Sequence, residues 1–163
     1  MKNKNTPYIL ILVGAPLSGK SFFIKEYLKN VDSNARIVSR DELVMEVYGS
    51  DDYNAAFKEV NQKDVDRLLD LRLKEVNINK ENVIIDMTNM VVSRRVKTLR
   101  YFSDDYYKEV IVFPVLDSDE YDRRNKERNA NENKWIPPFV ISSMLNSYQE
   151  PTLDEGFDKI TIL

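Results

Sequence analysis

A segment near the start of the chain has the composition and spacing of a phosphate-binding loop, or P-loop. Its sequence is Gly14-Ala15-Pro16-Leu17-Ser18-Gly19-Lys20-Ser21, and it holds two of the four glycines of the chain. Glycine at both positions permits backbone angles and a close approach that a side chain would block. Backbone N–H groups of such a loop bind a polyphosphate, Lys20 supplies a cation for the β- and γ-phosphates, and Ser21 supplies a hydroxyl for Mg²⁺. The segment therefore predicts a nucleoside triphosphate and Mg²⁺ as ligands, the alternative being a plain strand–helix turn.

The chain contains neither histidine nor cysteine. Any general base must therefore be a carboxylate or, less suitably, a lysine or a tyrosine. Asp41 is the best-placed carboxylate, because it follows an apolar run at residues 35–39 and begins a helical pattern. In phosphoryl transfer, an aspartate in such a place accepts the proton of an attacking hydroxyl. The same position also suits a helix N-cap, and the position alone does not decide between the two roles.

A second acid, Asp86, ends the apolar run Val83-Ile84-Ile85. An acid at the end of a buried strand is typical of the residue that holds Mg²⁺ directly or through water in P-loop proteins. We therefore assign Asp86 to the metal and to the substrate side of the nucleotide. The alternative is a buried partner for Lys20 or for backbone donors.

Two groups of arginines could bind phosphate. Arg124 and Arg128 are four residues apart, so they share one face of a helix, where a cation could stabilise the charge that develops during phosphoryl transfer. Arg94 and Arg95 lie in a basic helical segment that follows the strand ending at Asp86, and they could contact a substrate phosphate. In both groups the alternative is an ordinary solvated helix face.

The remaining pattern shows how these residues could meet. Apolar runs predict five strands, at residues 8–13, 35–39, 82–88, 110–116 and 157–163. Helical patterns lie between them, at residues 20–29, 42–49, 53–76, 93–102, 119–128 and 139–148. Such alternation predicts a parallel α/β sheet, and ligands bind at the edge where its strands end. We therefore expect the P-loop, Asp41 and Asp86 to converge there, below a lid whose polar segment 129–134 is predicted to be mobile.

Size and charge restrict the remaining possibilities. The chain has 163 residues, which is the size of one domain, and a net charge of −3. Nucleic-acid contacts would therefore come from a local basic patch rather than from the overall charge. No apolar run is long enough to cross a membrane, and no long apolar segment follows the charged N-terminus. We expect no membrane contact, no signal peptide and a cytoplasmic location, in the host if the chain is phage-encoded.

Taken together, the motifs resemble those of the phage-type 5′-polynucleotide kinases, within the wider P-loop kinase family. The resemblance covers nearly the whole chain and rests on the P-loop, Arg40-Asp41, Val83-Ile84-Ile85-Asp86-Met87-Thr88-Asn89, Arg94-Arg95, Arg124-Asn125-Lys126-Glu127-Arg128, Trp135-Ile136-Pro137 and the tail Tyr148-Gln149-Glu150-Pro151-Thr152. It implies a single domain over 1–163, a P-loop kinase-like three-layer sandwich with a five-stranded parallel sheet and a helical lid over about 118–136.

The same resemblance implies a reaction and a set of residue roles. The γ-phosphate of ATP would pass to the 5′-hydroxyl end of DNA or RNA, a reaction of nucleic-acid repair. Asp41 would be the base, Lys20 and Arg128 would be catalytic, and Arg124 would bind the nucleotide. Arg40, Asp86, Arg94 and Arg95 would line the substrate site.

Two positions depart from that family. The acid near the end of the third strand, Asp86, falls one residue earlier than in the best-known phage enzyme, and the other departure is at residue 44. Phage kinases carry an arginine one turn after the base, where it holds a substrate phosphate, and this chain has Val44. Val44 and the acidic net charge leave a second hypothesis open, a kinase whose acceptor is a small molecule or a nucleoside. A third hypothesis is a nucleotide-binding module whose output is a conformational change without phosphate transfer, because a mobile lid can signal as well as catalyse.

Overall fold

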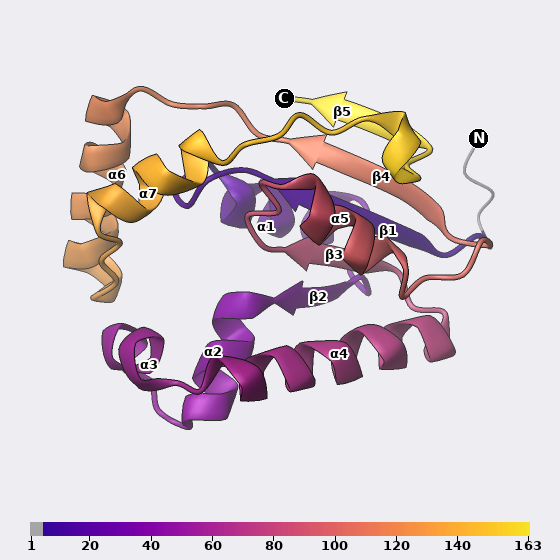
Figure 1. Ribbon diagram of the computed structural model, residues 1–163, viewed down its shortest axis with the longest axis horizontal. Coiled ribbons are helices and arrows are strands. Elements are labelled where there is room, and N and C mark those ends of the chain that lie inside the picture. Colours follow the sequence, from indigo (N-terminus) through magenta and orange to yellow (C-terminus); the bar gives the residue numbers. More distant parts are fainter. Residues whose placement is uncertain (1–4) are drawn as a thin grey trace.

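The computed structural model describes residues 5–163 (Figure 1). Residues 1–4, which belong to the charged N-terminus considered in the sequence analysis, lie outside the described residues. Within residues 5–163, five strands form one sheet in the order β2-β3-β1-β4-β5, and every pair is parallel. The strands are β1 Tyr8–Val13, β2 Arg36–Ser39, β3 Val83–Asp86, β4 Tyr107–Val112 and β5 Lys159–Ile162. The predicted five-stranded parallel α/β sheet is therefore confirmed.

Helices connect the strands and cover both faces of the sheet. They are α1 Lys20–Asn30, α2 Arg40–Tyr48, α3 Tyr53–Glu59, α4 Gln62–Asn79, α5 Val92–Leu99, α6 Ser118–Glu132, α7 Pro138–Asn146 and the 3-10 helix η1 Leu153–Glu155. One face of β1 packs on α1 through Ile24, and the other packs on α4 and α5 through Leu73 and Leu99. All residues of β1 are buried between these layers, which explains its uninterrupted apolar sequence.

The central strands bring distant segments to the same edge. Strands β2 and β3 are in register from Arg36 opposite Val83 to Ser39 opposite Asp86. Because both strands end at this register, the residue after Ser39 and the residue after Asp86 emerge together. The strand β4 begins earlier than predicted and ends at Val112, since Pro114 has no N–H group to donate to a ladder.

The predicted long helix at residues 53–76 is wrong, because two helices occupy this region. Helix α3 ends at Glu59, and Val60 has an extended backbone with φ −64° and ψ 141°. Asn61 then caps α4, and its side chain accepts a hydrogen bond from the N–H of Lys63. Helices α2, α3 and α4 enclose their own small core around Leu43, Val44, Ala56 and Val65.

The segment 129–134 also differs from expectation. Helix α6 continues to Glu132, and Asn133 ends it in the left-handed region at φ 51°. The amide of Asn125 donates to the carbonyl oxygen of Ile136 at 2.6 Å and accepts from its N–H at 3.1 Å. The chain beyond α6 is therefore fastened back onto the helix.

None of the helices between residues 5 and 163 combines the length and the apolar character needed to cross a lipid bilayer.

Candidate active site

The P-loop joins β1 to α1, as the sequence predicts. The N–H of Gly14 donates a 3.0 Å hydrogen bond to the carbonyl oxygen of Thr88, which ties the loop to the end of β3. A Cβ atom at Gly14 would lie 2.6 Å from Oγ of Ser18 and 2.9 Å from Cβ of Phe113. Gly19 has φ 104°, a conformation that favours glycine. Both glycines are therefore required by the path of the loop.

The loop and the first turn of α1 offer donors to an anion. The first bond of the helix runs from the N–H of Phe23 to the carbonyl oxygen of Gly19 at 3.0 Å. The preceding N–H groups, from Lys20 to Phe22, have no carbonyl partner within the helix. Oγ of Ser18 is buried and has no hydrogen-bond partner within residues 5–163. These free donors and the helix dipole fit a polyphosphate.

Lys20 is held inside the loop that it follows. Its Nζ atom donates to the carbonyl oxygens of Gly14 at 2.9 Å and Ala15 at 2.8 Å. Burial lowers its pKa to about 8, and the Asp86 and Asp41 carboxylates oppose this shift. The ammonium is therefore charged at neutral pH, and it lies where a bound phosphate would reach it.

Asp41 and Asp86 share this site with Lys20. Asp41 lies in the first turn of α2, and the N-cap residue of this helix is Ser39 rather than Asp41. Its carboxylate is open to solvent, but the surrounding protein removes enough hydration to raise its pKa, against the pull of Arg128 and Lys20. Burial also raises the pKa of Asp86, and Lys20 opposes this while Asp41 adds to it. The expected convergence at the sheet edge is therefore observed.

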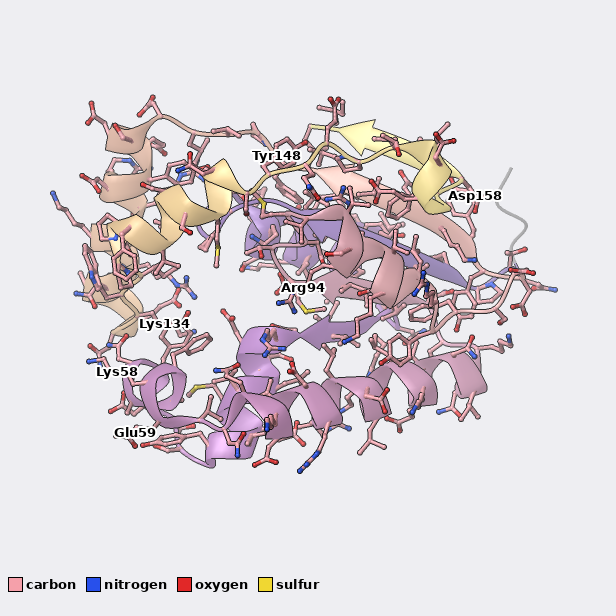
Figure 2. The ribbon with its side chains drawn as sticks, viewed as in Figure 1. Lys58, Glu59, Arg94, Lys134, Tyr148 and Asp158 are labelled. Atoms are coloured by element: carbon pink, nitrogen blue, oxygen red, sulfur yellow. The ribbon has the colours of Figure 1, made fainter. Side chains whose placement is uncertain are left out.

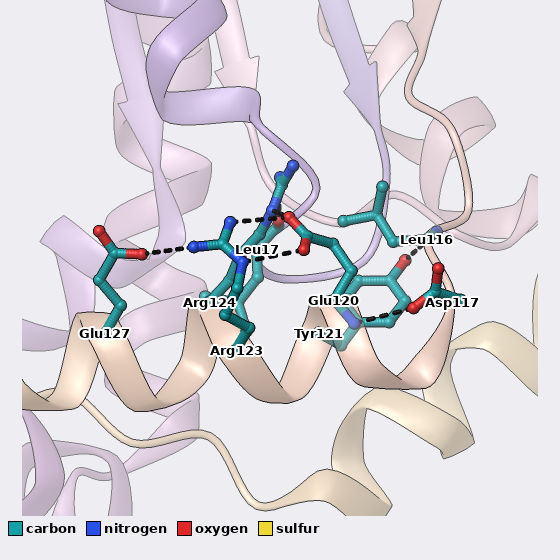
Figure 3. Close-up of polar contacts among 8 residues, drawn as sticks. All are labelled: Leu17, Leu116, Asp117, Glu120, Tyr121, Arg123, Arg124 and Glu127. Carbon is teal, nitrogen blue, oxygen red and sulfur yellow. Dashed lines mark hydrogen bonds and ion pairs between the residues drawn. The ribbon is translucent and has the colours of Figure 1, made fainter.

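Arg124 connects the lid helix α6 to the P-loop (Figure 3). Its Nη1 atom donates to the carbonyl oxygen of Leu17 at 2.9 Å, and its Nε atom donates to Glu120 at 2.7 Å. The neighbouring Arg123 binds Glu120 and Glu127 and is largely exposed. Of these two adjacent arginines, only Arg124 contacts the loop.

Arg128 lies farther along α6 and faces α3. Its Cζ atom is 5.4 Å from the ring centroid of Tyr53, which is within the range of a cation–π contact. Burial raises the pKa of Tyr53 to about 12, and the negative charge of Asp41 adds to this rise. The Tyr53 ring is therefore also close enough to Asp41 to respond to its charge. Arg128 acts in turn on the pKa of Asp41. The lid cation and the candidate base therefore occupy the same site.

The end of the lid rests on α3, which Figure 1 shows beside α6 at one end of the molecule. The side chain of Asn54 donates to the carbonyl oxygen of Asn133 at 3.1 Å and accepts from the N–H of Trp135 at 3.3 Å. Sequence patterns did not single out Tyr53, Asn54 or Lys134, the residue between Asn133 and Trp135. No local signal could have paired Asn54 with Trp135, because 81 positions separate them.

The arginines assigned to the substrate differ in their surroundings. Arg40 is bound to Asp66 at 2.9 Å and to Gln62 at 2.8 Å. The Arg94 side chain is exposed on α5, and it makes no hydrogen bond or ion pair within the described residues (Figure 2). Arg94 is therefore available to an acceptor, whereas Arg40 is engaged by α4.

Arg95 does not lie on the surface patch that its sequence context suggested. Its side chain is fully buried and forms two hydrogen bonds with Glu155, at 2.7 and 2.8 Å. A third bond, of 2.9 Å, joins it to the carbonyl oxygen of Asn89. Arg95 joins α5 to η1 and cannot reach a substrate from this buried position. The prediction that it binds a substrate phosphate is therefore wrong.

The donors around the loop suit a Mg²⁺ ion that is shared with phosphates. Ser21 offers a hydroxyl, and Asp86 offers a carboxylate at the end of β3. Within residues 5–163, no three acidic, histidine or cysteine side chains cluster as a metal site of their own. Mg²⁺ often binds through one or two protein oxygens, several waters and the phosphates of a nucleotide, which matches this set.

Comparison with known families assigns the chain to a family. A family model described as AAA domain, AAA_33, matches residues 9–151 of the chain. The chain belongs to this family of AAA domains. The match includes the P-loop, Asp41, Asp86 and both lid arginines.

The AAA domain is similar to several solved structures. A chain of the Pnkp1/Rnl/Hen1 RNA repair complex matches at TM-score 0.70 and 25% identity, over 90% of this chain and 46% of that chain. Kti12 of Chaetomium thermophilum with ADP-AlF3 matches at TM-score 0.68 and 19% identity, over 95% of this chain and 88% of the Kti12 chain. A gluconokinase of Sinorhizobium meliloti matches at TM-score 0.58 and 13% identity, over 98% of this chain and 83% of the gluconokinase chain. The last two show the fold alone.

These matches identify a P-loop kinase-like α/β domain. The chain spans less than half the length of the RNA repair chains that it matches.

Proposed function

We propose that this AAA domain transfers the γ-phosphate of ATP to the 5′-hydroxyl end of DNA or RNA. The observation that carries the proposal is the position of Asp41 in the first turn of α2, directly after Ser39, which is in register with Asp86, while the N–H of Gly14 in the P-loop donates to Thr88 just after Asp86. A carboxylate beside a P-loop lysine can accept a proton from a hydroxyl that attacks the terminal phosphate.

The proposed reaction is an in-line displacement at phosphorus. The oxygen of the acceptor hydroxyl forms a bond to the γ-phosphorus, and Asp41 accepts the hydroxyl proton. The bond between the γ-phosphorus and the bridging oxygen breaks, and ADP leaves with that oxygen. Lys20 stabilises negative charge on the phosphate oxygens from the P-loop side, and Arg128 stabilises it from the lid side.

The other residues bind and orient the nucleotide. Backbone N–H groups of the loop bind the phosphates, and Arg124 closes the lid on the loop. Ser21 and Asp86 would hold Mg²⁺, which neutralises phosphate charge when it is bound. These roles require no group outside the chain, ATP, Mg²⁺ and the acceptor.

Two observations support a polynucleotide as the acceptor. The solved chain at 25% identity belongs to an RNA repair complex. Arg94 provides an exposed cation on α5, after the strand that ends at Asp86, and its side chain has no hydrogen bond or ion pair within residues 5–163. An exposed arginine suits a phosphate of an extended acceptor.

The experiment is phosphate transfer from γ-labelled ATP with Mg²⁺ to 5′-hydroxyl DNA and RNA oligonucleotides in parallel. We expect label at the 5′ end of at least one, and its loss with Asp41→Asn. Asp122→Asn is a matched control, because Asp122 is an exposed acid on α6. Absence of transfer above the Asp41→Asn level with both oligonucleotides would reject the proposal.

A small-molecule acceptor is the second candidate. Val44 replaces the substrate arginine of the phage kinases, and the chain shares its fold with a gluconokinase. Labelling of a nucleoside or a sugar, with no labelling of oligonucleotides, would favour this candidate. The third hypothesis, a nucleotide-binding module whose output is a conformational change, requires ATP binding without phosphate appearing on any acceptor.

A further inference from the structure

The segment that follows β3 leaves the sheet but stays bonded to β1, the strand beside it in Figure 1. The last matched pair of the two strands is Ile11 opposite Ile85, and β3 ends one residue later at Asp86. Beyond that point, the side-chain Nδ2 atom of Asn89 donates a 2.8 Å hydrogen bond to the carbonyl oxygen of Leu12. The contact between the strands therefore continues up to the start of the P-loop.

The amide of Asn89 takes the place of a main-chain donor. In a parallel ladder, a residue of one strand donates its N–H to one residue of the neighbour and accepts from the residue two positions later. The carbonyl oxygen of Thr88 accepts from the N–H of Gly14 at 3.0 Å, as a ladder residue would. The matching bond to Leu12 comes from the side chain of Asn89 instead. Two bonds therefore fix the first residue of the P-loop against the segment after Asp86.

The backbone of Asn89 explains how its side chain reaches β1. Its φ angle is 48°, in the left-handed region, which asparagine tolerates better than most other residues with a side chain. Nη1 of Arg95 donates to its carbonyl oxygen at 2.9 Å and holds this turn from the side of α5. Glycine could adopt the same turn but has no amide to donate, so asparagine meets two requirements at this position.

The amide is held by its donor side. Asn89 is 2% exposed, and its Nδ2 atom also donates to the carbonyl oxygen of Met87 at 3.3 Å. Its Oδ1 atom is buried and has no hydrogen-bond partner within residues 5–163. An unpaired buried acceptor lowers stability. The two donated bonds are therefore the contribution of this side chain, and both fasten the segment that begins at Asp86.

The distance between this segment and the P-loop matters for a metal ion. In the proposed reaction, Ser21 and Asp86 hold Mg²⁺ from opposite sides, one after the loop and the other at the end of β3. Burial raises the pKa of Asp86, and the charge of Lys20 opposes this rise, so the acid faces the loop. Mg²⁺ requires near-ideal octahedral geometry with short bonds. A shift of Asp86 relative to the loop would therefore weaken binding of the magnesium-bound nucleotide more than binding of the nucleotide alone.

We propose that Asn89 is a positioning residue that fixes Asp86 relative to the P-loop and thereby sets the affinity for ATP in its magnesium-bound form. This inference rests on the proposed function for the roles of Asp86 and Mg²⁺, but it is independent of the acceptor. Asn89 itself touches neither the metal nor the nucleotide in this assignment.

The experiment is calorimetric titration of ATP, once with Mg²⁺ and once with EDTA, into the wild type and Asn89→Gly. Glycine keeps the left-handed backbone and removes only the amide. The Kd for ATP with Mg²⁺ should rise roughly 10-fold or more, as it does when a residue that orients a metal ligand is lost. The Kd in EDTA should change little, because the P-loop and Lys20 remain.

A second variant separates positioning from stability. Asn89→Ala also lacks the donor, but alanine is strained in the left-handed region, so urea denaturation should find it less stable than Asn89→Gly. Both variants should nevertheless give the same pair of Kd values. Lys80→Gly is the matched control, because Lys80 has φ 53° and lies three residues before β3 begins, at the other end of the strand. It should bind ATP as the wild type does under both conditions.

A double-mutant cycle tests whether Asn89 acts through Asp86. Asp86→Asn should remove most of the gain in affinity that Mg²⁺ provides. Asn89→Gly added to Asp86→Asn should then have little further effect, because both changes remove the same interaction. Fully additive effects of the two changes would overturn the inference.

The remaining outcomes keep the two claims apart. An equal rise of Kd with Mg²⁺ and with EDTA in Asn89→Gly, or no rise in either, would overturn the inference and leave the proposed function intact. A wild type that shows the expected dependence on Asn89 but transfers phosphate to no oligonucleotide would reject the proposed function and leave the inference standing. Failure of the wild type to bind ATP under either condition would reject both.

Discussion

Arg124 donates a 2.9 Å hydrogen bond to the carbonyl oxygen of Leu17, and this bond joins the lid helix α6 to the P-loop. Leu17 has a left-handed backbone with φ 69°, so its carbonyl oxygen is presented by a strained turn of the loop. Glu120 orients the arginine from one turn earlier in α6. The position of the lid is thereby linked to the conformation of the nucleotide-binding loop.

Replacement of Arg124 should weaken ATP binding. We expect Arg124→Met to raise KM for ATP roughly 10-fold, because a charged donor to the loop is lost. Arg123→Met is the control, since Arg123 shares the partner Glu120 but not the contact with Leu17. Steady-state kinetics with varied ATP concentration measure the KM for ATP of both variants. Equal KM values for the two variants would contradict a link through Arg124.

The lowered pKa of Lys20 predicts a pH dependence of ATP binding. The free protein holds this lysine with a pKa of about 8, so the ammonium loses its proton as the pH rises above that value. ATP binds the charged form, and its Kd should therefore be about 10-fold higher at pH 9 than at pH 7. Calorimetry over this range measures the change.

The matched variant for this test is Lys20→Arg. Arginine keeps its charge over the whole range, so its Kd for ATP should vary little between pH 7 and pH 9. A wild-type Kd that is independent of pH would show that the Lys20 proton is not linked to ATP binding.

The buried pair of Arg95 and Glu155 predicts a large effect on stability. Arg95→Met leaves a buried carboxylate without its partner, and we expect a loss of about 3–5 kcal/mol in the free energy of unfolding. Urea denaturation measures it. Removal of both charges, in Arg95→Met with Glu155→Met, should cost less than the single change. The exposed pair of Lys74 and Asp70 is the control, and Lys74→Met should lower the free energy of unfolding far less than Arg95→Met.

An arginine introduced at position 44 should not create a substrate site. Val44→Arg would place a charge in the core of α2, α3 and α4, and we expect it to lower the free energy of unfolding by more than about 3 kcal/mol. Val44→Ala, which only leaves a cavity, should cost about 2 kcal/mol. A stable Val44→Arg protein with a lower KM for oligonucleotides would mean that this position faces the substrate.

The sequence was sufficient where the signal is local. The apolar run of β1 and the two glycines of the P-loop define the first unit, because a strand buried on both faces and a loop that wraps an anion each restrict residue type. The end of β3 at Asp86 follows from the same logic. The convergence of these parts then follows from parallel topology, which needs no knowledge of side-chain contacts.

The errors have a common physical origin, since they depend on contacts between distant residues or on weak periodicity. The break at Val60 lies inside a continuous helical pattern, and only the cap at Asn61 marks it. Helix α6 has few apolar residues, and the amide of Asn125 fastens its end to Ile136. The role of Arg95 depends on Glu155, which lies 60 positions away.

The most direct test of the central claim is single-turnover phosphate transfer by Asp41→Asn with saturating ATP, Mg²⁺ and a 5′-hydroxyl oligonucleotide. If Asp41 is the base, the rate of transfer should fall about 100-fold or more, while ATP binding should change little. In the wild type the rate should rise with pH through the raised pKa of Asp41, and this acid limb should be absent in the variant. Transfer by Asp41→Asn at the wild-type rate, or an unchanged acid limb, would contradict the claim.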